Sequence, residues 1–148
     1  MKKYFILLAI GFVLNVLFVF NSADCYEAIY YEKAFSNKMY NFGIYPYVAS
    51  FAGLFTVFIL FAYYYIADSV SFSRWFHWLA LMIFTMAFIG ILTYAFIIHF
   101  QKEIEQSFPM QSVLFSLVQM GVVALLFVID SFSMRWWSIN CRHTPIPE

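Results

Sequence analysis

One uninterrupted apolar segment, YVASFAGLFTVFILFAYYYIA at Tyr47–Ala67, limits the possible folds of this chain more than any other feature. It carries no formal charge, and the polar sequence Asp68-Ser-Val-Ser follows it directly. An α-helix rises about 1.5 Å per residue, so about 20 apolar residues cross the ~30 Å hydrocarbon core of a bilayer. The segment therefore predicts a transmembrane helix, and we expect an integral membrane protein.

The composition of the whole chain agrees with this class. Hydrophobic residues make up 64%, aromatic residues 24% and charged residues 11%, whereas about 25% of a soluble domain is charged. The formal net charge is zero, so the chain has no positive field that would attract nucleic acid. Neither cysteine, Cys25 or Cys141, belongs to a CxxC pair, and nothing predicts a redox centre or a cysteine-rich metal site.

Similar apolar runs predict further spans, so we expect an all-α protein with a single transmembrane domain over residues 1–148, a four-helix bundle. The predicted spans are about 4–20, 47–67, 75–100 and 110–129. The first run follows Lys2-Lys3 and has an alternative interpretation as a secretory signal. Its apolar part is long for such a signal, and Asn21-Ser22-Ala23 is a poor cleavage sequence, so a retained helix is favoured.

The segments outside the spans are assigned by their polarity. Residues 21–46 form the longest polar segment and are rich in tyrosine, which predicts an extracytoplasmic loop at headgroup depth, where the ring is buried and the hydroxyl stays in water. A binding surface for an extracytoplasmic partner is the alternative. Within this segment Asp24 and Glu27 have the spacing of a short-helix cap. Residues 130–148 are expected to form a cytoplasmic tail.

The distribution of cations predicts the orientation in the membrane. Four spans place both termini on one side. If that side is the cytoplasm, the cations inside are Lys2, Lys3, Arg74, Arg135 and Arg142, and those outside are Lys33, Lys38 and Lys102. This excess of cations inside favours an N-in, C-in, multi-pass protein of the inner (cytoplasmic) membrane. Cys25 and Cys141 then lie on opposite sides and are not expected to form a disulfide.

The two halves of the sequence resemble each other. When Pro46 is aligned with Pro109, Asp68-Ser-Val-Ser meets Asp130-Ser-Phe-Ser, and Arg74-Trp75 meets Arg135-Trp136. We interpret this as a tandem duplication of a two-helix hairpin. Each copy has an even number of spans, so the copies share one orientation and are related by an axis along the membrane normal. Convergence is the alternative, because serine, arginine and tryptophan are common at helix ends.

The same alignment indicates where helices pack. It pairs Ala49 and Gly53 with Ser112 and Ser116, which gives each helix a small-xxx-small motif. Lipid tails give helices no hydrophobic reason to associate, so close backbone approach and polar contacts hold them together. These four residues are therefore predicted at helix contacts, either within the protein or between protomers.

Charged residues at the ends of the second and fourth spans form the candidate site. An acid at a helix C-terminus opposes the helix dipole, so Asp68 and Asp130 are expected to pair with Arg74 or Arg135. The predicted cytoplasmic docking face consists of Asp68, Arg74, Trp75, Asp130, Arg135 and Trp136. The alternative is a set of solvated charges at headgroup depth, each of which contributes little.

Several chemistries find no support in the sequence. An ion-coupled transporter is disfavoured because no acid or base is expected deep in a span. His77 and His99 are expected at opposite faces, which disfavours haem ligation. No nucleophile and base are expected in one cleft, and phosphate-binding glycine patterns are absent. We therefore predict no catalytic residue, cofactor or metal site, and an enzyme is not expected.

The remaining hypothesis is a non-enzymatic membrane subunit. It would be a sensor or anchor that associates in the bilayer with itself or another membrane protein and recruits a cytosolic partner through the docking face. An immunity or exclusion protein that acts in the membrane against a pore-forming toxin or phage is the alternative, matched in size and topology only. A small channel is the second alternative, based on polar residues within the spans: Asn15, Thr56, Thr85, Thr93, Tyr94 and Gln119.

Overall fold

The computed structural model describes residues 2–103 and 107–142, and these form helices and turns with no strand. The α-helices are α1 (Lys2–Phe20), α2 (Ser22–Ile29), α3 (Lys33–Asn41), α4 (Ile44–Phe61), α5 (Trp75–Glu103) and α6 (Pro109–Met134). A π-helical turn at Ala62–Ala67 extends α4, and 3₁₀ turns occupy Val70–Phe72 and Arg135–Trp137. The all-α class is confirmed. Residues 143–148 of the predicted tail lie outside the described part of the chain.

The length and apolarity of the helices support a membrane protein. Three segments are long and apolar enough to cross a bilayer: Ile44–Ala67, Trp75–Lys102 and Pro109–Trp137. A fourth crossing exists if Tyr4–Phe20 and Ser22–Ile29, which are bent by 74° relative to each other, count as one broken span. The described chain thus has three to four candidate spans.

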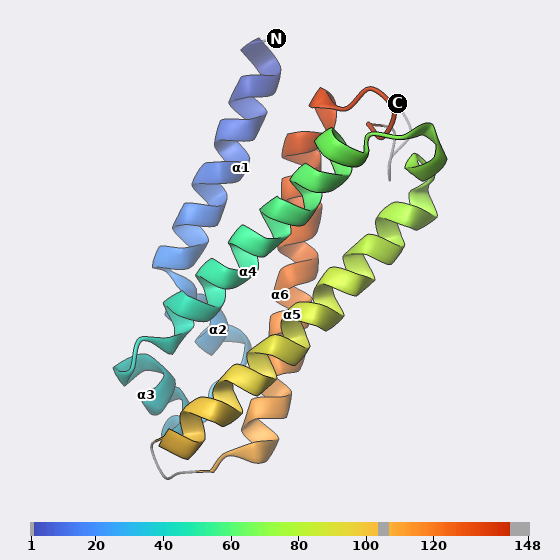
Figure 1. Cartoon of the computed structure of the whole chain (residues 1–148). Helices are drawn as coiled ribbons and strands as arrows, with labels where there is room; N and C mark the ends of the chain where they lie inside the picture. The colour runs from blue at the N-terminus through green and yellow to red at the C-terminus, as the bar shows by residue number, and fades with distance from the viewer. Residues whose placement is uncertain (1, 104–106, 143–148) are drawn as a thin grey trace.

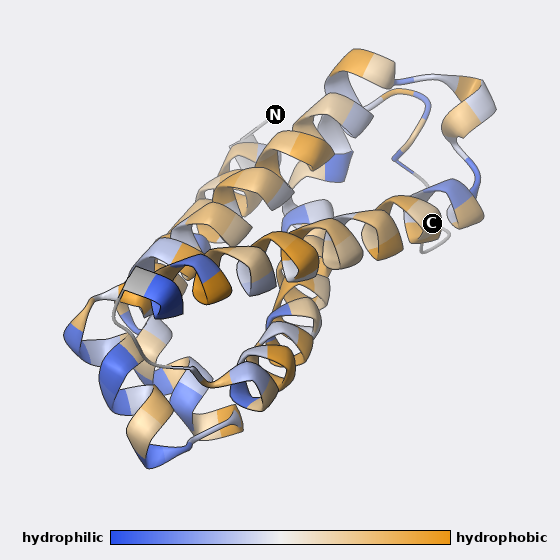
Figure 2. Cartoon of the chain, turned by 60° about the horizontal axis from the view of Figure 1, so that its bottom comes forward, coloured by the Kyte–Doolittle hydropathy of each residue, from blue (hydrophilic) through white to orange (hydrophobic). Residues whose placement is uncertain are grey.

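The long helices alternate in direction, and α6 has the central position. Figure 1 shows α1 running toward the end of the bundle that holds α2 and α3, α4 returning, α5 descending again and α6 rising toward the C-terminus. The start of α1 and the end of α6 therefore lie at one end of the molecule. Helix α6 contacts α1, α4 and α5. In Figure 2 hydrophobic residues cover the long helices, and hydrophilic residues gather at the α2–α3 end and in the connections.

Residues 21–46, expected as a loop, instead fold into α2, α3 and the start of α4. The Glu32 carboxylate accepts a hydrogen bond of 2.8 Å from the Phe35 backbone N–H and so caps α3. Tyr26 and Phe35 are buried, and their rings lie 5.1 Å and 5.9 Å from the ring of Phe115 on α6. The Tyr26 hydroxyl donates to Gln119 Oε1 at 2.5 Å. The segment is therefore part of the core at this end.

The two halves differ in local structure where their sequences agree best. Asp68 follows the π-helical turn and has φ of 22° and ψ of 50°, a left-handed conformation that aspartate tolerates better than most residues. Asp130 lies within α6, which continues to Met134. The aligned Asp-Ser-x-Ser sequences thus adopt a turn in one half and a helix in the other, and the duplication remains a prediction.

Candidate functional site

Asp68 holds the C-terminal segment. Its Oδ1 accepts hydrogen bonds from the Ser138 hydroxyl at 2.5 Å and the Asn140 backbone N–H at 2.9 Å, and its Oδ2 accepts from the Ile139 N–H at 3.3 Å. The Asn140 side chain in turn donates to the Asp68 carbonyl at 2.6 Å. These donors, led by the Ser138 hydroxyl, lower the pKa of the Asp68 carboxyl. The negative charge of Asp68, which was expected to pair with an arginine, is thus compensated by hydrogen-bond donors of the segment Ser138–Cys141. We name this segment the C-terminal hook.

Cys141 closes this hook against the end of the bundle. Its side chain is fully buried, its backbone N–H donates to the Ser138 hydroxyl at 2.8 Å, and its thiol lies 3.6 Å from the Ser69 carbonyl. Burial raises the pKa of the thiol. The hook is therefore a packed element and not a free tail.

The other residues of the predicted docking face separate into an exposed pair and a packed pair. Arg74 and Trp75 are exposed at the start of α5, with Trp75 62% exposed. The Arg135 guanidinium lies 4.4 Å from the centre of the Trp136 ring, which stacks on Tyr4 of α1 at 5.6 Å. Arg135 and Trp136 thus link the end of α6 to the start of α1.

Asp130 lies inside the bundle and not on the surface at the end of a helix. It is 2% exposed and falls within the candidate span Pro109–Trp137. Its Oδ1 accepts a hydrogen bond of 2.6 Å from Asn15 Nδ2 on α1, while its Oδ2 is buried without a hydrogen-bond partner among the described residues. Asp130 is thus a buried acid within a candidate span, where no acid was expected.

The sequence signal that could have placed Asp130 inside the bundle is a stripe of polar residues along α6. The buried face of α6 includes Ser112, Ser116, Gln119, Asp130 and Ser133, spaced by multiples of about one helical turn. The fourth span was expected to end at Ile129 because the apolar run ends there. No glycine or proline follows before Met134, so nothing in the local sequence stops the helix at Asp130.

Close helix contacts surround the Asn15–Asp130 pair. A Cβ atom added to Gly53 would lie 2.9 Å from Asn15 Oδ1, and one added to Gly11 would lie 2.8 Å from the Ser133 Cβ. Gly53 therefore allows α4 to approach α1, and Gly11 allows α1 to approach α6.

The remaining residues predicted at helix contacts are also buried: Ala49, Ser112 and Ser116. Ser112 meets α5, since its hydroxyl accepts a hydrogen bond of 2.7 Å from Gln101 Nε2. The Ser116 hydroxyl donates to the Ser112 carbonyl at 2.7 Å within α6. The aligned small residues of the two halves thus have different neighbours.

A second polar junction ties three helices together. The Ser131 hydroxyl on α6 accepts a hydrogen bond of 2.8 Å from Trp78 Nε1 on α5 and lies 2.5 Å from the Tyr64 hydroxyl in the π-helical turn that extends α4. Trp78 is buried in this junction. The interhelical hydrogen bonds fix the ends of α4, α5 and α6 relative to one another.

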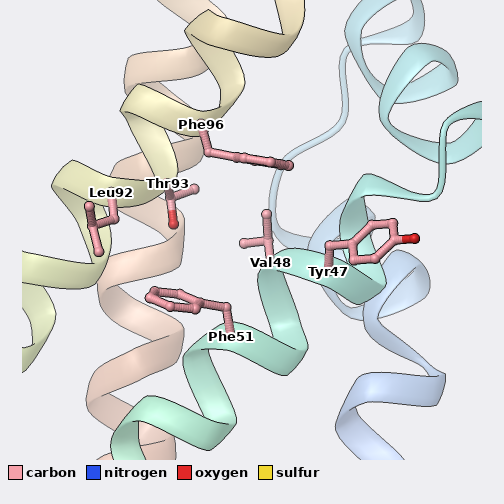
Figure 3. Close-up of a pocket in the computed structure, with 6 residues that line it drawn as sticks. All are labelled: Tyr47, Val48, Phe51, Leu92, Thr93 and Phe96. Carbon is pink, nitrogen blue, oxygen red and sulfur yellow. The ribbon is translucent and has the colours of Figure 1, made fainter.

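Two cavities differ in their chemistry. One, of about 340 Å³, lies between α4 and α5 (Figure 3), where the Thr93 hydroxyl is directed into an otherwise apolar space and the Tyr47 hydroxyl points away from it. The other, of about 430 Å³, lies between α1, α4 and α6 and contains Asn15, Asp130 and Ser133. Only the second combines an acid with unpartnered oxygen atoms.

The described side chains offer hydrogen-bond acceptors and aromatic surfaces. Within residues 2–103 and 107–142, no three His, Cys, Asp or Glu side chains come together in a group that would hold a metal ion. No protein-family profile, curated protein or solved structure matches the chain.

Proposed function

We propose that the protein is a non-enzymatic, multi-pass subunit of the inner membrane, a sensor or anchor that binds a cytosolic protein at the end of the bundle bearing both termini. The observation that carries this proposal is the C-terminal hook. Ser138, Ile139 and Asn140 donate four hydrogen bonds to Asp68. An otherwise free tail is thus given one conformation, which reduces the entropy lost when a partner binds.

The surface beside the hook has the composition of a binding site. Ile139 in the hook is 78% exposed, Trp75 is 62% exposed and Arg74 is exposed. Aromatic residues and arginine are enriched where proteins bind each other and often contribute most of the binding energy. A polar segment held in place with an apolar residue outward is suited to contact a protein in water.

The proposal includes four crossings with both termini in the cytoplasm. The start of α1 and the end of α6 lie at one end of the bundle (Figure 1), and Arg74 and Arg135 lie at the ends of helices on that side. Together α1 and α2 would provide the bent fourth span. We retain the duplication of a hairpin as part of the proposal, supported by the sequence alignment; the different structures at Asp68 and Asp130 would then reflect divergence.

Association within the bilayer is the other part of the proposal. The predicted partner in the membrane is a second copy or another membrane protein, and exposed aromatic surface on α4 and α5 around the cavity of Figure 3 supports it. Aromatic rings offer a large rigid contact area. This surface also favours the alternative of an immunity or exclusion protein, because an intruding helix would meet it in the lipid. No comparable observation favours a channel, since Gln119 is engaged by Tyr26.

Affinity capture from gently solubilised membranes tests the cytosolic partner. We expect a soluble protein to co-purify with the wild type and with Ile91→Ala, an exposed control in the middle of α5, and to be reduced about tenfold by Arg74→Glu with Trp75→Ala. Equal recovery with all three forms would contradict the docking face. Protection of cells against a toxin or phage that survives the Arg74→Glu change would favour the alternative.

A further inference from the structure

The cavity between α1, α4 and α6 has a polar end and an apolar body. Asp130 and Asn15 form the polar end, while Leu8, Phe12 and Val57 contribute apolar walls. Its volume of about 430 Å³ falls in the range of roughly 300–1,000 Å³ that is usual for small-molecule sites. Phe12 is 71% exposed on α1, so the apolar body is open toward the hydrocarbon region of a bilayer.

Two acceptor atoms that belong to residues lining the cavity lack donors. Asp130 Oδ2 and Asn15 Oδ1 are both buried with no hydrogen-bond partner in the described chain. The orientation of the Asn15 amide is fixed, because its Nδ2 donates to the Gly11 carbonyl at 3.0 Å and to Asp130 Oδ1 at 2.6 Å. The site therefore presents two oxygens that were taken out of water and not paired, which is unfavourable unless something donates to them.

Among the described residues, no cationic side chain lines the cavity beside this carboxyl. The lining residues of α1, α4 and α6 are apolar except Asn15, Asp130 and Ser133. An intramembrane acid is costly and usually marks a functional site, and one of the two carboxyl oxygens of Asp130 has no donor among the described residues. A positive charge that arrives from outside the protein would compensate the carboxylate.

The chemistry of the lining selects among possible cations. Metal cations such as Ca²⁺ take about six to eight oxygen ligands, but this cavity offers side-chain oxygens only from Asn15, Asp130 and Ser133. A primary ammonium needs about three acceptors and carries an apolar chain, which matches a few oxygens beside Leu8 and Phe12.

We propose that this cavity binds a lipophilic amine from the bilayer, with the ammonium group donating to Asp130 Oδ2 and Asn15 Oδ1 and the apolar part lying against Leu8, Phe12 and Val57. The site is separate from the C-terminal hook, so this inference goes beyond the proposed docking function. If the protein is a sensor, this site indicates the chemical class of its ligand. Binding of the amine does not depend on the existence of a cytosolic partner.

Binding of a matched pair of probes to the protein in phosphatidylcholine nanodiscs tests the proposal. The probes are dansylcadaverine, a fluorescent primary amine, and the same dansyl amide with a hydroxyl in place of the amine. We expect the wild type to bind the amine at least tenfold more tightly than the alcohol. We expect Asp130→Asn to weaken amine binding at least tenfold and to leave alcohol binding unchanged.

A second variant tests the cavity without changing the acid. Ala9→Leu fills part of the apolar body and should reduce amine binding about tenfold, whereas Ala95→Leu, on an exposed position of α5, should not. Circular dichroism and a monodisperse elution profile establish that each variant is folded. If Asp130→Asn does not fold, Ala9→Leu decides. Equal affinity for amine and alcohol, or amine binding that survives both Asp130→Asn and Ala9→Leu, would overturn the proposal.

Discussion

At the scale of single residues, one interhelical hydrogen bond has consequences beyond its own strength. Asn15 and Asp130 are 115 positions apart in sequence and bond at 2.6 Å. Interhelical hydrogen bonds in membranes contribute about 0.6 kcal/mol on average. Removal of the donor costs more, because the Asp130 carboxyl then has neither oxygen paired, and an orphaned buried polar group costs about 1–3 kcal/mol.

We therefore predict strong coupling between these two residues. Asn15→Ala should destabilise the protein by about 1–3 kcal/mol, and it should cost less when Asp130 is already alanine, with a coupling free energy of about 0.5–2 kcal/mol. Unfolding by sodium dodecyl sulfate in mixed micelles, followed by circular dichroism, measures all four corners of this cycle. If the two effects add within about 0.3 kcal/mol, the hydrogen bond does not link α1 to α6 as described.

The sequence identified both aspartates as residues that need compensation, but it could not supply their partners. Ser138 lies 70 positions after Asp68, and Asn15 lies 115 positions before Asp130. Arginines a few residues away were the nearest candidates in the chain, whereas the actual donors are set by which helices meet. Local patterns indicate the cost of a buried or misplaced charge, and tertiary structure decides what offsets it.

At the scale of elements, the C-terminal hook is expected to open when Asp68 is removed. In a Cys25→Ser background Cys141 is the single thiol, and its burial should make reaction with a maleimide slow. Asp68→Ala removes three acceptor contacts from the hook, so we predict about a tenfold or greater rise in the reaction rate. Asp24→Ala, at an exposed position of α2, is the control. An unchanged rate in Asp68→Ala would mean that other contacts hold the hook.

The same element should depend on pH in one direction. Hydrogen bonds to the ionised carboxyl lower the pKa of Asp68 in the closed hook relative to the open one. Closure is therefore fully favoured above the ordinary aspartate pKa of about 3.9 and weakens as the pH falls through the lowered pKa of the closed form. We predict that hydrogen-exchange protection of the Asn140 amide declines below about pH 4 in the wild type. Asp68→Asn should abolish this dependence, and a decline that persists in that variant would assign it to another group.

The packing of α1 provides a test based on glycine. Gly11→Ala places a Cβ 2.8 Å from the Ser133 Cβ, and overpacking of this kind costs about 1–3 kcal/mol. Gly121 has no neighbouring atom within 4 Å of an added Cβ, so Gly121→Ala should be neutral or stabilising by about 0.5–1 kcal/mol through helix propensity. Detergent unfolding compares the two. Adding Ser133→Gly to Gly11→Ala should recover part of the loss, and equal stability of both single variants would show that α1 does not approach α6 closely.

At the scale of the whole molecule, the sequence predicted the long helices well and the α2–α3 end poorly. The third span was expected at 75–100, and α5 runs from Trp75 to Glu103, because the length of an apolar run is a local property. Residues 21–46 looked like a loop because they are polar on average. Their buried residues, among them Tyr26 and Phe35, face a core made by α4 and α6, and that core is absent from any local window of sequence.

The number of crossings remains the largest prediction at this scale, and it depends on α1. If α1 and α2 form a bent span, a short tag placed before Met1 lies in the cytoplasm and is protected from protease added to intact spheroplasts. If α1 does not cross, the chain has three spans, formed by α4, α5 and α6. The segment before α4 then lies outside, together with Cys25 and the same tag. We predict protection of the tag together with labelling of Cys25, which is exposed on α2, by a membrane-impermeant maleimide. A C-terminal tag is the control, because it is inside in both arrangements. Cleavage of the N-terminal tag from outside would contradict both the fourth crossing and the packing of α1 on α6, because the stacked rings of Tyr4 and Trp136 place the start of α1 at the same end of the bundle as the end of α6.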